Sequence, residues 1–214
     1  APGCNLIMVK VLDRKGNGYS SDVLAGISWV LERKEQLGIR ILNISVGACS
    51  KRGMSENSAL VKGVNRAWDA GLVVVVAAGN NGPRTMSITT PGISRKVITV
   101  GCSDDDREVL VGGNRMVDYS GRGPTAACIC KPDLVAPGCS VVSCSSRADK
   151  YTIKSGTSMS TPIVSGAVAL LLERFPDMSN KDVKLRLRES SVDIGLPRNQ
   201  QGWGLLDVGK MLER

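Results

Sequence analysis

The sequence SGTSMSTPIVSGAVALLLE, residues 155–173, joins a polar turn that contains glycine to a long segment that is apolar almost all round. Such a segment predicts a helix buried in the middle of a domain, because a surface helix would keep one polar face. The turn lies where the first N–H groups of the helix have no intrahelical partner. A serine at this place is held beside donors that favour negative charge, which suits a nucleophile. Serines and threonines in an isolated turn are more commonly simple caps.

The chain has 214 residues, of which 42% are hydrophobic and only 3% aromatic, so its core must be aliphatic. This length supports one substantial core, and we expect a single domain over residues 1–214. The run LVVVV at residues 72–76 is typical of a central strand covered on both faces, as in a parallel α/β sheet. A second apolar run, LIMVKVL at residues 6–12, also predicts a strand.

The formal net charge is +8, but basic and acidic residues are interspersed along the chain. This pattern favours solvated faces over a nucleic-acid surface, which would need a continuous basic stripe. No apolar run reaches the length of a membrane span, and no signal peptide is recognised. We therefore expect neither a nucleic acid nor a membrane as a partner.

The chain contains seven cysteines, at positions 4, 49, 102, 128, 130, 139 and 144. An odd and irregularly spaced set is a poor disulfide framework for a domain of this size. Cys128, Cys130, Cys139 and Cys144 could form a zinc site, but the first pair is separated by a single residue. The spacing favours small buried or half-buried thiols over zinc. Reduced thiols favour the cytoplasm without excluding secretion, so the compartment stays open.

Two further segments place polar or small residues at the ends of predicted strands. Residues 39–48 form one predicted strand, which ends in small residues and would let another extended backbone lie close. Asn80 follows the 72–76 run, at the carboxyl end of a central strand, where open α/β sheets place ligands. An asparagine in the sequence Asn-Asn-Gly is equally typical of a left-handed turn.

Together these patterns resemble the subtilisin-like serine proteases. The resemblance rests on Gly-Thr-Ser-Met-Ser-Thr-Pro at 156–162, Ala-Ala-Gly-Asn-Asn-Gly at 77–82 and Lys-Pro-Asp-Leu-Val-Ala-Pro-Gly at 131–138. It implies a three-layer α/β fold, with a mostly parallel twisted sheet and helices on both faces, lacking the N-terminal part of the family's domain. It also implies that Ser158 is the nucleophile and that Asn80 donates to the oxyanion, together with the backbone N–H of Ser158.

The resemblance further implies which segments bind a peptide or protein substrate. The segment 45–47 would pair with the substrate main chain as an added strand and also form one wall of the primary specificity pocket, and the other segments would line the rest of that pocket. These residues are Ser45, Val46, Gly47, Ala77, Ala78, Gly79 and Thr89. Because they are uncharged, we expect a preference for apolar side chains. No cofactor is required; relatives can hold a structural cation, but no carboxylate pair here supports one, so no metal ligand is assigned.

The chain contains no histidine. A serine hydroxyl is a weak nucleophile until a base takes its proton, and in this family the base is a histidine oriented by an aspartate. We therefore expect the C-terminal portion of a subtilisin-like catalytic domain, inactive alone, whose partner is an N-terminal segment carrying the Asp and the His.

Two other functions are compatible with parts of this pattern. One is a non-catalytic relative that binds peptides or a partner protease through the same cleft. The other is an unrelated hydrolase with a Gly-x-Ser-x-Gly elbow. The second is disfavoured because Ser160 occupies the last glycine position of that motif and because its triad also needs histidine.

Overall fold

The computed structural model describes residues 1–47, 55–146 and 150–213. At its centre is a parallel sheet with the strand order β1-β2-β3-β6. The strands are β1 (Ile41–Ile44), β2 (Val73–Ala77), β3 (Ile98–Cys102) and β6 (Leu134–Ala136). Every residue of β2, β3 and β6 is buried, as expected for strands covered on both faces.

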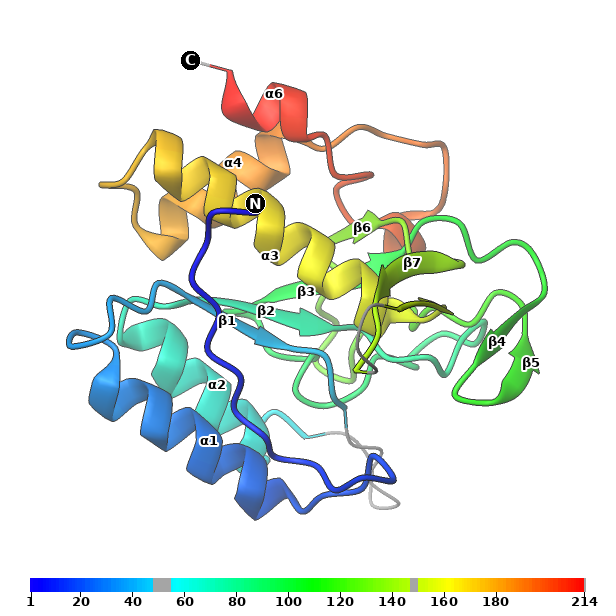
Figure 1. Ribbon diagram of the computed structural model, residues 1–214. Helices are drawn as coiled ribbons and strands as arrows, with labels where there is room; N and C mark the ends of the chain where they lie inside the picture. Colours follow the sequence, from blue (N-terminus) through cyan, green and yellow to red (C-terminus); the bar gives the residue numbers. More distant parts are fainter. Residues whose placement is uncertain (48–54, 147–149, 214) are drawn as a thin grey trace.

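Helices cover both faces of this sheet (Figure 1). On one face lie α1 (Ser20–Arg33) and α2 (Ala59–Asp69), and on the other α3 (Thr157–Arg174) with α4 (Asn180–Ser190). Two short helices follow α4, namely α5 (Arg198–Gln201) and α6 (Val208–Leu212). Two antiparallel hairpins complete the described elements: β4 (Val109–Val111) with β5 (Asn114–Met116), and β7 (Val141–Cys144) with β8 (Tyr151–Lys154). The predicted three-layer α/β fold is confirmed.

The helix predicted from the 155–173 sequence is α3, but it is not buried all round. One side packs on the sheet through residues such as Val164, Val168 and Leu171, each with no exposed surface. Its other side, which includes Ile163 and Leu170, is only partly buried. The described part of the chain does not supply enough apolar surface to cover both sides of this helix. No described helix, α3 included, has both the length and the apolar character to cross a bilayer.

The predicted strand at residues 6–12 is wrong for this structure. The segment pairs with no strand in the described residues, and Leu6 and Met8 are 86% and 90% exposed. Val9 alone of this run packs against the main core. A strand needs a neighbour for its backbone hydrogen bonds, and β1, the first strand of the sheet, pairs only with β2 among the described strands. An open groove of about 770 Å³ lies along this segment and α1.

An ion pair is buried where β6 begins beside β3. Lys131 is 1% exposed, and its Nζ donates to the carbonyl of Val97 at 3.0 Å and to the carboxylate of Asp133. Asp133 also accepts the backbone N–H of Thr99 at 2.7 Å, which ties the two strands together. Burial lowers the pKa of Lys131 to about 8, although the charge of Asp133 opposes this shift.

Candidate active site

Ser158 is the second residue of α3, and the turn before it depends on glycine. Gly156, the N-cap, has a φ of 138°, a conformation that side chains other than glycine rarely adopt. Its N–H donates to the carbonyl of Gly138 at 2.9 Å, which anchors the turn to the neighbouring loop. The Ser158 side chain is partly exposed, and its Oγ donates to the carbonyl of Ser45 at 2.8 Å. The serine is therefore held at the carboxyl edge of the sheet, beside the end of β1.

Asn80 reaches the same turn from the end of β2. Its Oδ1 accepts two hydrogen bonds from Thr157, one from the backbone N–H and one from the hydroxyl, each at 3.0 Å. Because an N–H donor requires an acceptor, these bonds fix the side-chain amide with Oδ1 toward Thr157. The Nδ2 of Asn80 is then the atom left to donate to another group. Gly79 reinforces the contact by donating its N–H to the Thr157 hydroxyl at 3.2 Å.

The predicted substrate-binding segments also come together, around Thr89. A Cβ added at either Gly47 or Gly79 would overlap the Thr89 side chain, so both glycine backbones lie against it. Thr89 in turn donates its N–H to the carbonyl of Ala78 at 2.8 Å. The end of β1, the end of β2 and the loop after it are thus one assembly within the described structure.

The members of this assembly differ in exposure. Ala77, Ala78 and Thr89 are buried, whereas Ser45, Val46 and Gly79 are half-buried and Gly47 is exposed. The side chains of Ala77 and Ala78 therefore face the interior, and what these residues can present to a ligand is main chain. Val46 packs partly against the core.

Comparison with known proteins decides the family. Residues 1–204 match the family model described as "Subtilase family". The chain belongs to the subtilase family. It is 39% identical over 208 residues to serine protease AprX of Bacillus subtilis (strain 168), an alignment that covers 89% of this chain and 47% of AprX. It is 34% identical over 210 residues to subtilisin DY of Bacillus licheniformis, with 97% of this chain and 68% of that protein covered.

The solved structure of sphericase is similar in fold to this subtilase chain. Its TM-score is 0.76 at 31% identity, and the match covers 92% of this chain and 66% of that one. The chain therefore spans about half the length of AprX and about two thirds of the length of subtilisin DY and sphericase.

The hydroxyl of Ser158 has no basic partner in the described residues of this subtilase chain. Its hydrogen-bond acceptor there is the carbonyl oxygen of Ser45, and the sequence has no histidine. A carbonyl oxygen accepts a hydrogen bond but is far too weak a base to remove the proton of an alcohol. The described residues therefore hold the Ser158 hydroxyl in place but supply no base that could take its proton.

Sequence reasoning missed the role of Thr157. This residue is fully buried, and through its N–H and hydroxyl it connects Asn80 to the start of α3. In the sequence, the one indication of this role is that Thr157 directly precedes Ser158. A threonine at the start of a helix is common for capping alone, so its position does not predict the contact with Asn80.

The prediction of small buried or half-buried thiols holds for only part of the cysteines. Cys102 and Cys139 are buried, whereas Cys4, Cys128, Cys130 and Cys144 are exposed, and Cys49 lies outside the described residues. The four cysteines weighed as a zinc site are not brought together. Instead, the structure places Cys139 beside Cys102 and Asp104, a group that sequence spacing did not reveal.

Proposed function

We propose that this chain supplies the nucleophile and the oxyanion donors of a subtilisin-like serine endopeptidase, with the Asp and His provided by a separate segment. The observation that supports this most is the contact of Asn80 with Thr157, the residue before Ser158. It brings an amide donor from one strand and a hydroxyl from one helix to a single turn, so that both can act on one carbonyl group.

The reaction would be acyl transfer. The Oγ of Ser158 attacks the carbonyl carbon of a peptide bond while the histidine of the second segment takes its proton. The substrate oxygen, now negative, accepts hydrogen bonds from Asn80 Nδ2 and from the N–H of Ser158, which lies in the first turn of α3 and has no intrahelical acceptor. The amine leaves with the proton from the histidine, and water then hydrolyses the acyl-enzyme and restores Ser158.

One edge of β1 has no partner among the described strands, which supports docking of a second segment there. Ser45 directly follows this strand, and its carbonyl is the group that Ser158 contacts. A parallel strand added to that edge would bring its own carboxyl end beside Ser158, where the ends of parallel strands meet. The half-buried side of α3 and the exposed apolar residues Leu6 and Met8 offer additional apolar surface for such a segment.

The substrate would be an extended peptide that pairs with Ser45, Val46 and Gly47 as an added strand. The same segment would form one wall of the pocket for its principal side chain, and the main chain of Ala77, Ala78 and Gly79, with Thr89, would line the rest. Since none of these residues is charged, we expect cleavage after apolar side chains in a peptide-library digest. A strong preference for Lys or Arg would contradict this assignment of the pocket.

The experiment compares the 214-residue chain alone with the same chain assembled with a segment that carries the Asp and the His. The chain alone should not hydrolyse casein, whereas the assembled protein should do so and should react with a fluorophosphonate at Ser158. Ser158→Ala should abolish both properties of the assembled protein. Hydrolysis by the chain alone that Ser158→Ala removes would show that no second segment is needed.

A non-catalytic subtilase homologue that binds peptides or a partner protease is the other outcome of this test. An assembled protein that binds peptides but neither hydrolyses them nor reacts with the fluorophosphonate would establish it. Such a homologue could lose Ser158 without consequence, so Ser158→Ala would leave peptide binding unchanged.

A further inference from the structure

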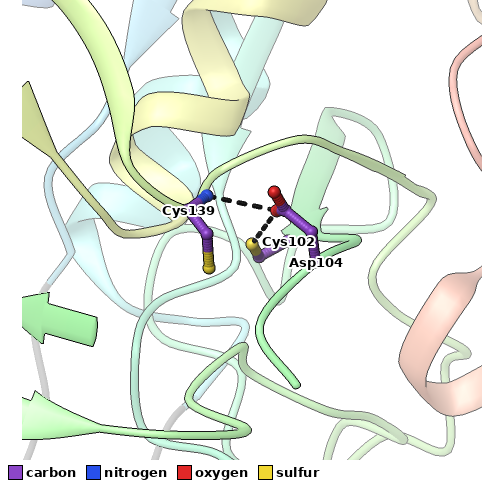
Figure 2. Close-up of side chains that lie close together, drawn as sticks. All are labelled: Cys102, Asp104 and Cys139. Carbon is purple, nitrogen blue, oxygen red and sulfur yellow. Dashed lines mark hydrogen bonds between the residues drawn. The ribbon is translucent and has the colours of Figure 1, made fainter. Parts of the chain in front are cut away.

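A cluster of buried thiols lies behind the turn that holds Ser158. Figure 2 shows its three members, which we call the thiol cluster: Cys102 at the end of β3, Asp104 just after it, and Cys139 between β6 and β7. One ligand atom from each residue, two sulfurs and a carboxylate oxygen, lies within 4.8 Å of the others. The proposed protease reaction uses none of the three.

The spacing of these atoms fits a tetrahedral metal ion. The Sγ of Cys102 lies 3.1 Å from Oδ1 of Asp104, and both sulfurs lie 3.2 Å from the hydroxyl of Tyr119. Zinc held at its usual distances of about 2.3 Å from sulfur and about 2.0 Å from oxygen needs ligand atoms roughly 3.5 to 3.8 Å apart. Small side-chain movements would therefore open the cluster to that size.

The backbone already holds the carboxylate in place. Oδ1 of Asp104 accepts the N–H of Gly138 at 2.8 Å and the N–H of Cys139 at 3.1 Å. The same oxygen also accepts a hydrogen bond from the Cys102 thiol at 3.1 Å. Such fixed orientation of a ligand by surrounding donors is typical of metal sites.

The charges around the cluster would balance a divalent ion. Two thiolates and one carboxylate around a divalent cation leave a single net negative charge. The guanidinium of Arg107 lies 3.4 Å from Oδ2 of Asp104 and supplies the opposite charge. The hydroxyl of Tyr119, a fully buried side chain, lies 3.2 Å from each sulfur, and its single proton can go either to the Gly138 carbonyl or, once a thiolate forms, to that thiolate. The Asp104 side chain is 30% exposed, so the ion can reach the cluster from solvent there. A water molecule would be the fourth ligand.

We propose that Cys102, Cys139 and Asp104 form a binding site for a zinc-type divalent ion. Thiolate ligands select such an ion over calcium or magnesium, which prefer oxygen. On binding, the two thiol groups release their protons and two sulfur–metal bonds form. The Asp104 carboxylate loses the hydrogen bond from the Cys102 thiol and coordinates the ion instead. No oxidant or reductant is needed.

The position of this site connects it to the nucleophile turn. The carbonyl of Gly138, directly before Cys139, accepts hydrogen bonds from the N–H of Gly156 at 2.9 Å and from Tyr119 at 3.2 Å. A bound ion would fix the loop that holds Gly156, two residues before Ser158. The site is therefore structural, and it stabilises the fold without touching substrate.

The test measures zinc and cobalt uptake by the reduced full chain after the five remaining cysteines are replaced by serine. This background variant should take up one zinc per chain and release two protons, and cobalt should give the charge-transfer band of a thiolate complex with tetrahedral d–d bands. Zinc should also raise the Tm. Cys102→Ser and Cys139→Ser should each remove the cobalt band and the Tm increase.

Asp104→Asn is the second variant, because it leaves both thiols and the residue shape unchanged. It should still fold, as judged by circular dichroism, and bind zinc at least about tenfold more weakly. Uptake that does not exceed that of the Cys102→Ser/Cys139→Ser double variant would overturn the proposal. So would a zinc affinity that Asp104→Asn leaves unchanged.

Discussion

Replacing Asn80 separates its structural contacts from its proposed catalytic one. In Asn80→Ala, the N–H and the hydroxyl of Thr157 lose their shared acceptor, and Thr157 is fully buried. A buried donor left without a partner costs about 1–3 kcal/mol, so we expect a loss of about 2 kcal/mol. For a chain of this size that loss lowers the Tm by about 4–8 °C.

The matched variant is Asn80→Asp, which keeps Oδ1 for both bonds from Thr157 and removes only the Nδ2 donor. A carboxylate beside the first turn of α3 also interacts favourably with the helix dipole. We therefore expect the stability of Asn80→Asp to stay within about 1 kcal/mol of the original chain. Thermal unfolding of the 214-residue chain and its two variants, followed by circular dichroism, measures the difference.

In the proposed assembled protease both variants should lose kcat, because each lacks the proposed oxyanion donor. The magnitude measured for such a donor in subtilisin itself is a drop of about 10²–10³, or roughly 3–4 kcal/mol. Wild-type kcat in Asn80→Asp would refute the oxyanion assignment. Equal stability of Asn80→Ala and the original chain would refute the account of the Thr157 contacts.

Three further changes test the packing. Burial lowers the pKa of Lys131 in the folded chain to about 8, from an ordinary value of 10.5, so between these pH values the unfolded chain binds more protons than the folded one. The free energy of unfolding should therefore rise with pH in this range, by roughly 3 kcal/mol relative to Lys131→Met. Urea unfolding of both proteins from pH 7 to 11 checks this, and a difference that does not change with pH would contradict it. Gly79→Ala should cost about 2–4 kcal/mol, because its φ is +93° and its Cβ would overlap Thr89, and an unchanged urea midpoint would argue against that packing. Gly166→Ala, inside α3 with open space around its Cβ, should instead stabilise by about 0.5–1 kcal/mol, and any loss measured in the same unfolding series would contradict the packing described for α3.

The failure of the predicted strand at residues 6–12 shows a limit of local patterns. The apolar run is real, but alternation and propensity describe only what a segment can do if a partner strand is present. Among the described strands β1 pairs with β2 alone, so its other edge is open, yet the run at 6–12 does not pair with it and Leu6, Ile7 and Met8 stay exposed. The half-buried α3 has the same cause, because a helix is buried all round only when elements cover both of its sides.

The sequence by itself determined the fold class and the positions of Asn80 and Ser158 relative to the predicted strand and helix. The run at 72–76 and the glycine turn before α3 have strong local signatures, and they place Asn80 and Ser158 at the ends of a buried strand and at the start of a helix. Only the tertiary structure decided that Thr157 orients Asn80 and that Cys102 meets Cys139. Those contacts depend on which strands are neighbours, since β3 and β6 run parallel side by side and their carboxyl ends converge. Spacing along the chain does not contain that information.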